Sequence, residues 1–249
     1  MIRVQYVWFV WASMFLLPWL VLFLAFPRYR KVMLWASVLT APFGLTEPLF
    51  VPEYWHPPSL FDLAHRTGFD IESLIFTFAL GGVGAVLYNA VASRTLVPFE
   101  HRPGNHRYHL YAVLSPLVAF PILYFFPWNP IYPSIVAMLL GALAALFCRR
   151  DLTSKTFYGG LLFAGFYVVF LEGLELLSPG YIGRFWKLSA LSGVKVGSMP
   201  LEELLFAFTL GMYWTGVYEH VTWSIAIRTA VGAGATRSDA HHVVPRPGR

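Results

Sequence analysis

Long apolar runs alternate with short polar or aromatic segments along the chain. Each run has about the length that a helix needs to cross a bilayer, roughly 20 residues at 1.5 Å per residue. The pattern predicts seven transmembrane helices, over residues 6–26, 32–51, 69–91, 108–126, 131–147, 157–177 and 200–220. We therefore expect an all-α integral membrane protein.

The third and seventh predicted helices begin with the same sequence pattern. Residues 70–81 (DIESLIFTFALG) align with residues 200–211 (PLEELLFAFTLG) at a constant offset that matches Glu72 with Glu202. Each copy follows a helix, a basic turn, a helix with a late glutamate and an aromatic connector. An offset of four helices leaves both copies in the same orientation, so we expect two parallel three-helix repeats, spans 1–3 and 5–7, joined by span 4. The expected units are a first repeat (1–92), a connecting loop with span 4 (93–130), a second repeat (131–222) and a mobile cytoplasmic tail (223–249).

Composition supports a membrane protein and excludes several other classes. The chain is 57% hydrophobic and 12% charged, whereas a soluble domain carries about 25% charged residues. A single cysteine, Cys148, excludes an internal disulfide and a cysteine-based zinc site. Thirteen Lys and Arg residues flank the predicted spans on one side and five on the other. This bias predicts the N-terminus outside and the C-terminus in the cytoplasm, and it explains the net charge of +5 without a nucleic-acid partner.

Carboxylates within the predicted spans are the candidate chemistry, because a charge in lipid costs several kcal/mol and usually has a function. If the repeats pack around a two-fold axis, these carboxyls converge, and like-charge repulsion keeps at least one of them protonated. A neutral acid in such a site is a proton donor, and an ionised neighbour is an acceptor. The set is Glu47, Glu72, Glu172, Glu175, Glu202 and Glu203.

Each of these residues also has a plainer interpretation. Acids in a first helical turn favour the helix dipole, which is an alternative for Glu202 and Glu203. Glu172 and Glu175 fit a structural hydrogen-bond network equally well, and Glu47 lies near the membrane interface. Aromatic side chains are candidates for substrate contact and cation stabilisation, with ordinary packing as the alternative. These are Trp55, Phe76, Trp186, Phe206, Tyr213 and Trp214.

The stretch Pro200-Leu201-Glu202-Glu203 resembles the Pro-x-Glu-(Glu/Asp) motif of the membrane-integral lycopene cyclases. Members of that family occur as two small homologous subunits, as fused two-repeat proteins, or as a domain of fungal bifunctional enzymes. The resemblance covers about residues 6–220 and matches the fused form. It implies carotenoid biosynthesis, with non-redox cyclisation of a linear carotene end into a β-ionone ring. One acid protonates the terminal double bond, the cation closes, and a proton leaves.

The resemblance implies that Glu202 and Glu203 are catalytic, with help from Glu72 and Glu172. The first repeat departs from the motif, because Asp70 stands where the proline would be and Ser73 where the second acid would be. The expected partners are a lipophilic carotenoid and membrane lipid. No cofactor and no metal are implied, and the sequence leaves open whether the chain forms a homo-oligomer.

Other functions are compatible with part of the pattern. The alternatives are a carrier for a polyene or another lipid, a cyclase or isomerase of a different isoprenoid, and a structural membrane subunit. A polar loop contains Glu100, His101, His106 and His109, but a basic loop favours solvated histidines over a metal site. The chain has no Asp-Asp-x-x-Asp-like cluster for a diphosphate, which disfavours prenyltransferases.

Overall fold

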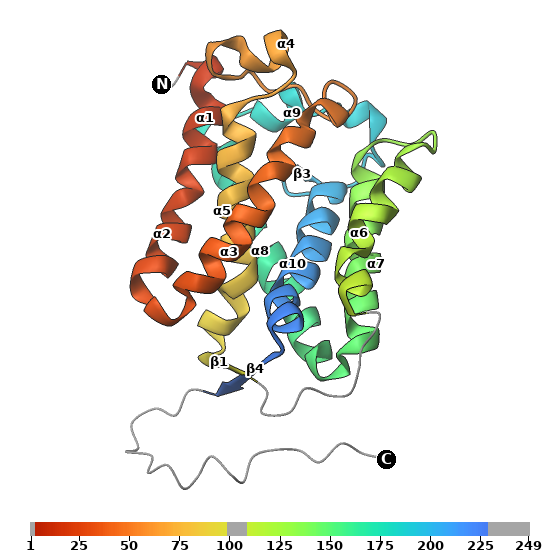
Figure 1. The fold of residues 1–249 in the computed structure, drawn as a ribbon. Coiled ribbons are helices and arrows are strands. Elements are labelled where there is room, and N and C mark those ends of the chain that lie inside the picture. The colour runs from red at the N-terminus through yellow and green to blue at the C-terminus, as the bar shows by residue number, and fades with distance from the viewer. Residues whose placement is uncertain (1–2, 99–108, 229–249) are drawn as a thin grey trace, which may run out of the picture.

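The computed structural model describes residues 3–98 and 109–228 and is mostly helical (Figure 1). The long helices run roughly side by side and form a bundle. They are α1 (Val4–Met14), α2 (Leu16–Ala25), α3 (Arg30–Thr40), α5 (Ile71–Val91), α6 (His109–Tyr124), α7 (Ile131–Cys148), α8 (Thr153–Leu177) and α10 (Leu201–Thr222).

Short elements complete the fold. The 3-10 helices are η1 (Pro27–Tyr29), η2 (Ala41–Leu49), η3 (Leu60–Asp62), η4 (Arg150–Leu152) and η5 (Leu188–Ala190), and the short α-helices are α4 (Leu63–Thr67) and α9 (Tyr181–Phe185). The strands are β1 (Arg94–Pro98), β2 (Lys195–Val196), β3 (Met199–Pro200) and β4 (Ser224–Arg228). The expectation of an all-α chain is therefore wrong in one detail, because two small antiparallel ribbons accompany the helices.

Five described helical segments are long and apolar enough to cross a membrane. They are Val4–Ala25, Pro27–Leu49, Ile71–Val91, Ile131–Cys148 and Arg150–Leu177. Their outer faces carry exposed large apolar side chains such as Phe147 and Val169, as expected for an integral membrane protein. Of the other two expected spans, α6 is shorter, and α10 has 22 residues but is less apolar. Seven spans therefore remain a prediction.

The helices α5 and α10 begin and end in corresponding ways. Each starts one residue before its glutamate, Glu72 or Glu202. Each is followed by a residue in the left-handed region, Ser93 (φ 48°) or Trp223 (φ 53°), which turns the chain into a strand. Non-glycine residues are uncommon at positive φ, so this shared turn is informative. The tail expected from residue 223 thus begins with β4, and residues 229–249 lie outside the described part of the chain.

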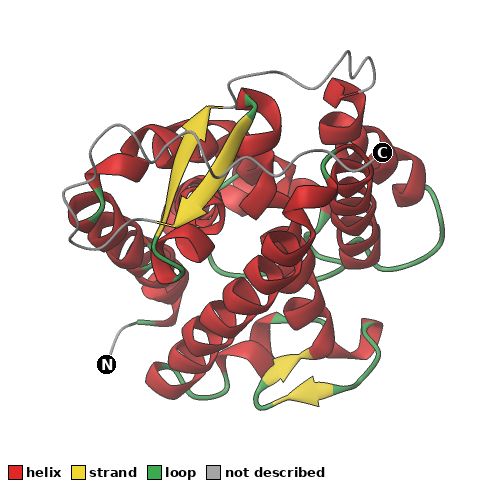
Figure 2. Ribbon diagram, turned by 90° about the horizontal axis from the view of Figure 1, so that it is seen from below, coloured by secondary structure: helices red, strands yellow, loops and turns green. Residues whose placement is uncertain are grey.

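Segments of the two halves pair at both ends of the bundle. At one end, β1 pairs with β4 so that Leu96 lies opposite Ala226, and Figure 2 shows this ribbon across the helix ends. At the other end, Trp55 forms an antiparallel bridge with Trp186, flanked by backbone hydrogen bonds from His56 to Phe185 and from Lys187 to Tyr54. The two connectors therefore meet above the bundle core.

Small residues let α8 and α10 approach closely. A Cβ added at Gly159 would lie 2.4 Å from Thr215 Oγ1, so only glycine fits there. The Thr215 hydroxyl in turn donates to the carbonyl oxygen of Gly84 on α5, at 3.2 Å. Close approach through small residues is a common way for membrane helices to pack. The contact fixes α10 against the helices that surround its glutamates.

Candidate functional site

A buried carboxyl at the start of α10 collects hydrogen bonds from both halves of the chain. Glu203 accepts hydrogen bonds from the hydroxyl of Tyr54, from the hydroxyl of Tyr167 at 2.9 Å and from the indole N–H of Trp186 at 2.8 Å. Tyr54 and Trp186 lie on the two connectors, and Tyr167 lies on α8. Together the three donors supply hydrogen bonds to both oxygens of a carboxyl in an otherwise apolar interior.

The Tyr54 hydroxyl is a dependable donor. Burial raises the pKa of Tyr54 well above its usual value, and the neighbouring Glu203 carboxylate raises it further. The hydroxyl therefore stays protonated across the physiological pH range. Because Tyr54 belongs to the first half of the chain and Glu203 to the second, the arrangement around this carboxyl requires both halves.

Glu202 is equally buried but has a different role in the structure. Its Oε1 atom accepts a hydrogen bond from the Tyr132 hydroxyl at 2.8 Å and from the backbone N–H of Ser192 at 2.7 Å. Ser192 belongs to the second connector, and Tyr132 to α7. Adjacent residues on a helix point about 100° apart, so Glu202 contacts α7 and the connector, whereas Glu203 contacts α8. Glu202 thus ties the connector to the bundle.

Three further predicted carboxylates accept backbone N–H groups of connector residues. Glu72 bonds Leu60 at 2.6 Å, in a position that corresponds to the Glu202–Ser192 contact. Glu172 bonds Ser198 at 2.8 Å. Glu175 bonds Gly180 at 2.6 Å and Ile182 at 3.0 Å, at the start of α9. The contacts of these carboxylates are therefore with loop backbone, and they hold the connectors over the helix ends.

Glu47 lies in η2 and is buried, with 7% of its surface exposed. Its Oε2 atom accepts a hydrogen bond from the Ser73 hydroxyl at 3.2 Å. Its Oε1 atom has no hydrogen-bond partner among the described residues. The sequence placed Glu47 near the membrane interface, where solvation was an alternative; its burial shows that it is not solvated.

Aromatic rings from both halves surround these carboxyls. The Trp55 and Trp186 rings lie 5.1 Å apart between centroids, and Trp8 meets Trp55 edge-on at 4.8 Å. Phe76 lies 5.4 Å from Trp8 and 6.3 Å from the Tyr167 ring. The predicted residues Trp55, Trp186 and Phe76 are thus brought together near Glu203.

The other predicted aromatic residues lie elsewhere. Phe206 is half-buried and packs against the apolar core. Tyr213 is ten residues after Glu203, about 15 Å further along α10 at 1.5 Å per residue. Its hydroxyl donates to the carbonyl oxygen of Val113 on α6, and Trp214 packs edge-on against its ring at 5.6 Å. Tyr213 and Trp214 therefore lie away from the Glu203 carboxyl in this structure.

An apolar groove opens on the outer face of the bundle between α1, α2 and α8. It has a volume of about 270 Å³. Its lining residues are Trp11, Met14, Leu17, Pro18, Phe166, Val169 and Phe170. The Phe170 ring lies between this groove and the aromatic cluster, 4.9 Å from the Trp11 ring and 6.5 Å from the Phe76 ring. Contacts between aromatic rings thus lead from the groove to the Glu203 region.

The matched part of the chain contains most of this site. Residues 129–221 match the family model described as lycopene cyclase. This part of the chain is therefore similar to a lycopene cyclase domain. The resemblance inferred from Pro200-Leu201-Glu202-Glu203 is confirmed over these residues. No curated protein and no solved structure matches the chain.

The matched residues include α7, α8, the second connector and almost all of α10. They therefore supply Glu203 with two of its three donors, Tyr167 and Trp186. The third donor, Tyr54, lies outside the matched residues, as does Glu47. The first half thus completes the hydrogen-bonding shell of a carboxyl that lies within the matched residues.

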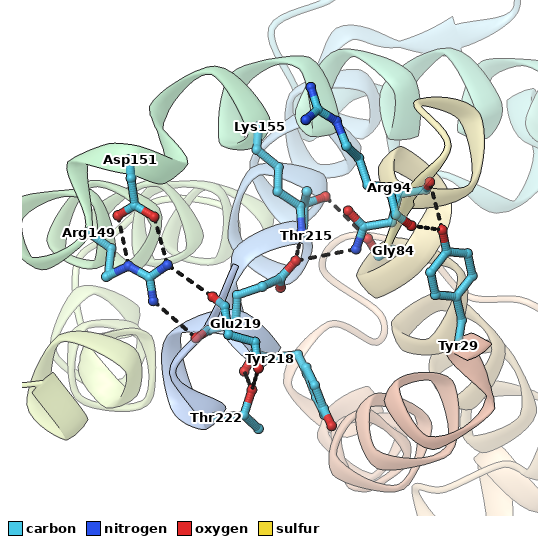
Figure 3. A network of polar contacts seen from close by, with 12 residues as sticks. Tyr29, Gly84, Arg94, Arg149, Asp151, Lys155, Thr215, Tyr218, Glu219 and Thr222 are labelled. Atoms are coloured by element: carbon cyan, nitrogen blue, oxygen red, sulfur yellow. Dashed lines mark hydrogen bonds and ion pairs between the residues drawn. The ribbon is translucent and has the colours of Figure 1, made fainter. Parts of the chain in front are cut away.

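A second polar cluster lies at the opposite end of the bundle (Figure 3). Lys155 forms a buried ion pair with Glu219, which also accepts a hydrogen bond from Asn89 at 3.3 Å. Arg149 pairs with Asp151 at 2.7 Å and donates to the backbone oxygen of Glu219 at 3.2 Å. Asn89 and Glu219 are 130 residues apart, the same offset that relates Glu72 to Glu202. This cluster joins the two halves near the β1–β4 ribbon.

Sequence reasoning missed the residues that make Glu203 and this cluster distinctive. Tyr167 places a hydroxyl in the middle of an apolar run, and buried tyrosines usually need a partner, so a signal was present. Tyr54 lies in an aromatic connector and Lys155 follows a basic turn between two predicted spans, so neither stands out from its surroundings in the sequence. Of the polar loop, Glu100, His101 and His106 lie outside the described residues. His109 stacks on His220, with ring centroids 3.9 Å apart.

Proposed function

We propose that this protein cyclises the end of a linear carotene, lycopene in the first instance, into a β-ionone ring. The reaction is an isomerisation: a proton adds to the terminal double bond, a ring carbon–carbon bond forms, and a proton leaves. The proposal rests on Glu203, a buried carboxyl that accepts three hydrogen bonds and lies within the residues that match the lycopene cyclase family model. A catalytic carboxyl in an apolar, water-excluded site suits proton exchange with a hydrocarbon.

We assign Glu203 to proton exchange with the substrate, and the aromatic cluster to stabilisation of the carbocation that forms during cyclisation. Indole and phenyl faces attract positive charge, and Trp55, Trp186 and Phe76 lie near this carboxyl. The remaining carboxylates act by position. Glu202 and Glu72 hold the two connectors in place through backbone N–H groups, and Glu172 and Glu175 support the second connector.

We propose that the polyene approaches through the apolar groove between α1, α2 and α8. The groove faces the lipid, and its Phe170 contacts lead toward Phe76 and Tyr167. Val169→Trp fills the groove and should raise the KM for lycopene without lowering the melting temperature. Leu161→Trp, on a lipid-exposed part of the same helix outside the groove, is the matched control. Equal KM values for the two variants would exclude this entry route.

The proposed orientation places the connectors and Glu203 toward the outer leaflet and the β1–β4 ribbon toward the cytoplasm. The ribbon end carries the described residues Arg28, Arg94, Arg149, Arg150 and Lys155 near the helix termini. Basic residues at the cytoplasmic side are the usual arrangement. Cysteine accessibility on either side of an intact membrane would measure this orientation.

Expression in a lycopene-producing host tests the function. The wild-type chain should yield a new monocyclic or bicyclic carotene, and Glu203→Gln should yield none at equal protein level in the membrane. Glu53→Gln is the matched control, because Glu53 is an exposed connector carboxylate paired with Lys187. Failure of the wild-type chain to form any ring despite good membrane levels would refute the cyclase. Pigment that co-purifies unchanged would instead indicate a carrier.

A further inference from the structure

The two halves of the chain are related by contacts between corresponding residues. The β1–β4 register places Leu96 opposite Ala226, its counterpart at the repeat offset, and the neighbouring pairs are interchanged around it. The connectors pair in the same manner around Trp55 and Trp186. A two-fold axis along the bundle produces this arrangement, in which each segment pairs with its own counterpart from the other half. Each side chain around Glu203 therefore has a corresponding place in the first half.

The position that corresponds to Glu203 is Ser73, yet a carboxyl occupies this place. The Ser73 hydroxyl donates to Glu47, which reaches it from η2 at 3.2 Å. The tryptophans of the two connectors, Trp55 and Trp186, pack against each other with ring centroids 5.1 Å apart, and the Trp186 indole donates to Glu203.

The surroundings of the two carboxyls differ in a way that separates their chemistry. Glu203 has three donors, two of them tyrosine hydroxyls. Glu47 has one unpartnered oxygen, and the charged groups that face it are the acids Asp70 and Glu72. Both carboxyls are buried without a cation, which favours the neutral form, but hydrogen-bond donors favour the ionised form, so Glu203 is the more readily ionised of the two. Two carboxyls in unlike environments are the pattern of an acid and base pair.

We propose that Glu47 is the catalytic proton donor and Glu203 the proton acceptor of the cyclisation, an inference that rests on the proposed function. The Glu47 O–H bond breaks as its proton forms a C–H bond at the terminal double bond. The resulting cation is attacked by the neighbouring double bond, which forms the ring, and Glu203 then takes a proton from a ring carbon. Between turnovers Glu203 loses its proton to water and Glu47 regains one, so no reductant or oxidant is consumed.

Glutamine at position 47 separates proton donation from structure. Glutamine has the shape of the neutral acid and can still accept the Ser73 hydrogen bond, but it cannot donate a proton to carbon. Glu47→Gln should therefore lower the rate of ring formation by about 100-fold or more, the usual contribution of a general acid. The amount of lycopene bound by the purified variant and its melting temperature should stay unchanged, and Glu47→Asp should recover part of the rate.

A second measurement reports on Glu47 without activity. Dicyclohexylcarbodiimide reacts with protonated carboxyls in apolar surroundings, so it should label Glu47 and leave Glu203 unlabelled in peptide mass maps of the membrane-embedded chain. Label on Glu203 and none on Glu47 would overturn the assignment. So would a Glu47→Gln variant that cyclises within two-fold of a wild-type chain shown to form rings. A wild-type chain that forms no ring refutes the proposed function itself, whatever the label shows.

Discussion

The hydroxyl groups around Glu203 give a quantitative test of how this carboxyl works. Tyr54→Phe and Tyr167→Phe each remove one donor and leave the ring in place. A hydrogen bond to a charged group contributes about 1.5–3 kcal/mol, and each 1.4 kcal/mol is tenfold in an equilibrium. If the ionised carboxyl is the proton acceptor, each variant should form rings roughly 10- to 150-fold more slowly at neutral pH. Raising the pH should restore part of the rate, because it repopulates the carboxylate.

The matched control is Tyr181→Phe. Tyr181 is buried next to the Trp186 ring, but its hydroxyl has no hydrogen-bond partner among the described residues. Initial rates should be measured on purified protein in nanodiscs with lycopene, with cyclic products separated by chromatography over a range of pH. The double variant Tyr54→Phe/Tyr167→Phe should not show the product of the single losses, because both groups bind one carboxyl. Rates for Tyr54→Phe and Tyr167→Phe equal to the control would refute this reasoning.

Two further predictions concern stability, measured by thermal and detergent unfolding. Lys155→Met or Glu219→Gln alone should destabilise the fold by about 3–5 kcal/mol, because each leaves a buried charge unpaired. The double variant should lose less stability than either single variant. Additive losses would show that the pair is not coupled. Gly159→Ala should cost about 1–3 kcal/mol through its contact with Thr215. Gly165→Ala, on the same helix with nothing within 4 Å of its added Cβ, should be neutral or slightly stabilising, and equal effects of the two would contradict the packing argument.

The sequence allowed the helical bundle, the resemblance over residues 129–221 and the asymmetry between Glu203 and Ser73 to be predicted. These features are local: apolar runs, a short motif and a comparison of two aligned segments. The partners of Glu203 were beyond reach, because Tyr54 is 149 residues away and arrives on an irregular connector. The roles of Glu72 and Glu202 were equally hidden, since their partners are backbone N–H groups, which every non-proline residue carries.

Glu47 shows the limit most clearly. Glu47 belongs to no recognisable motif, and its place near the end of the second predicted span suggested a residue at the membrane interface. The role proposed for Glu47 rests on its hydrogen bond with Ser73, the residue that corresponds to Glu203. A carboxyl supplied by a neighbouring segment cannot be found by aligning one repeat with the other, because the alignment compares residues and not the space they fill.

The contact between the two connectors also gives the protein an optical signal of its own. The Trp8 and Trp55 rings lie 4.8 Å apart between centroids at an interplanar angle of 89°. The Trp55 and Trp186 rings lie 5.1 Å apart at 47°. Indoles this close and this inclined couple their electronic transitions, which produces a paired feature in near-ultraviolet circular dichroism. That feature should change when a polyene reaches the rings or when the connectors separate. Occupancy of the region can thus be followed in the unlabelled protein, independently of any product.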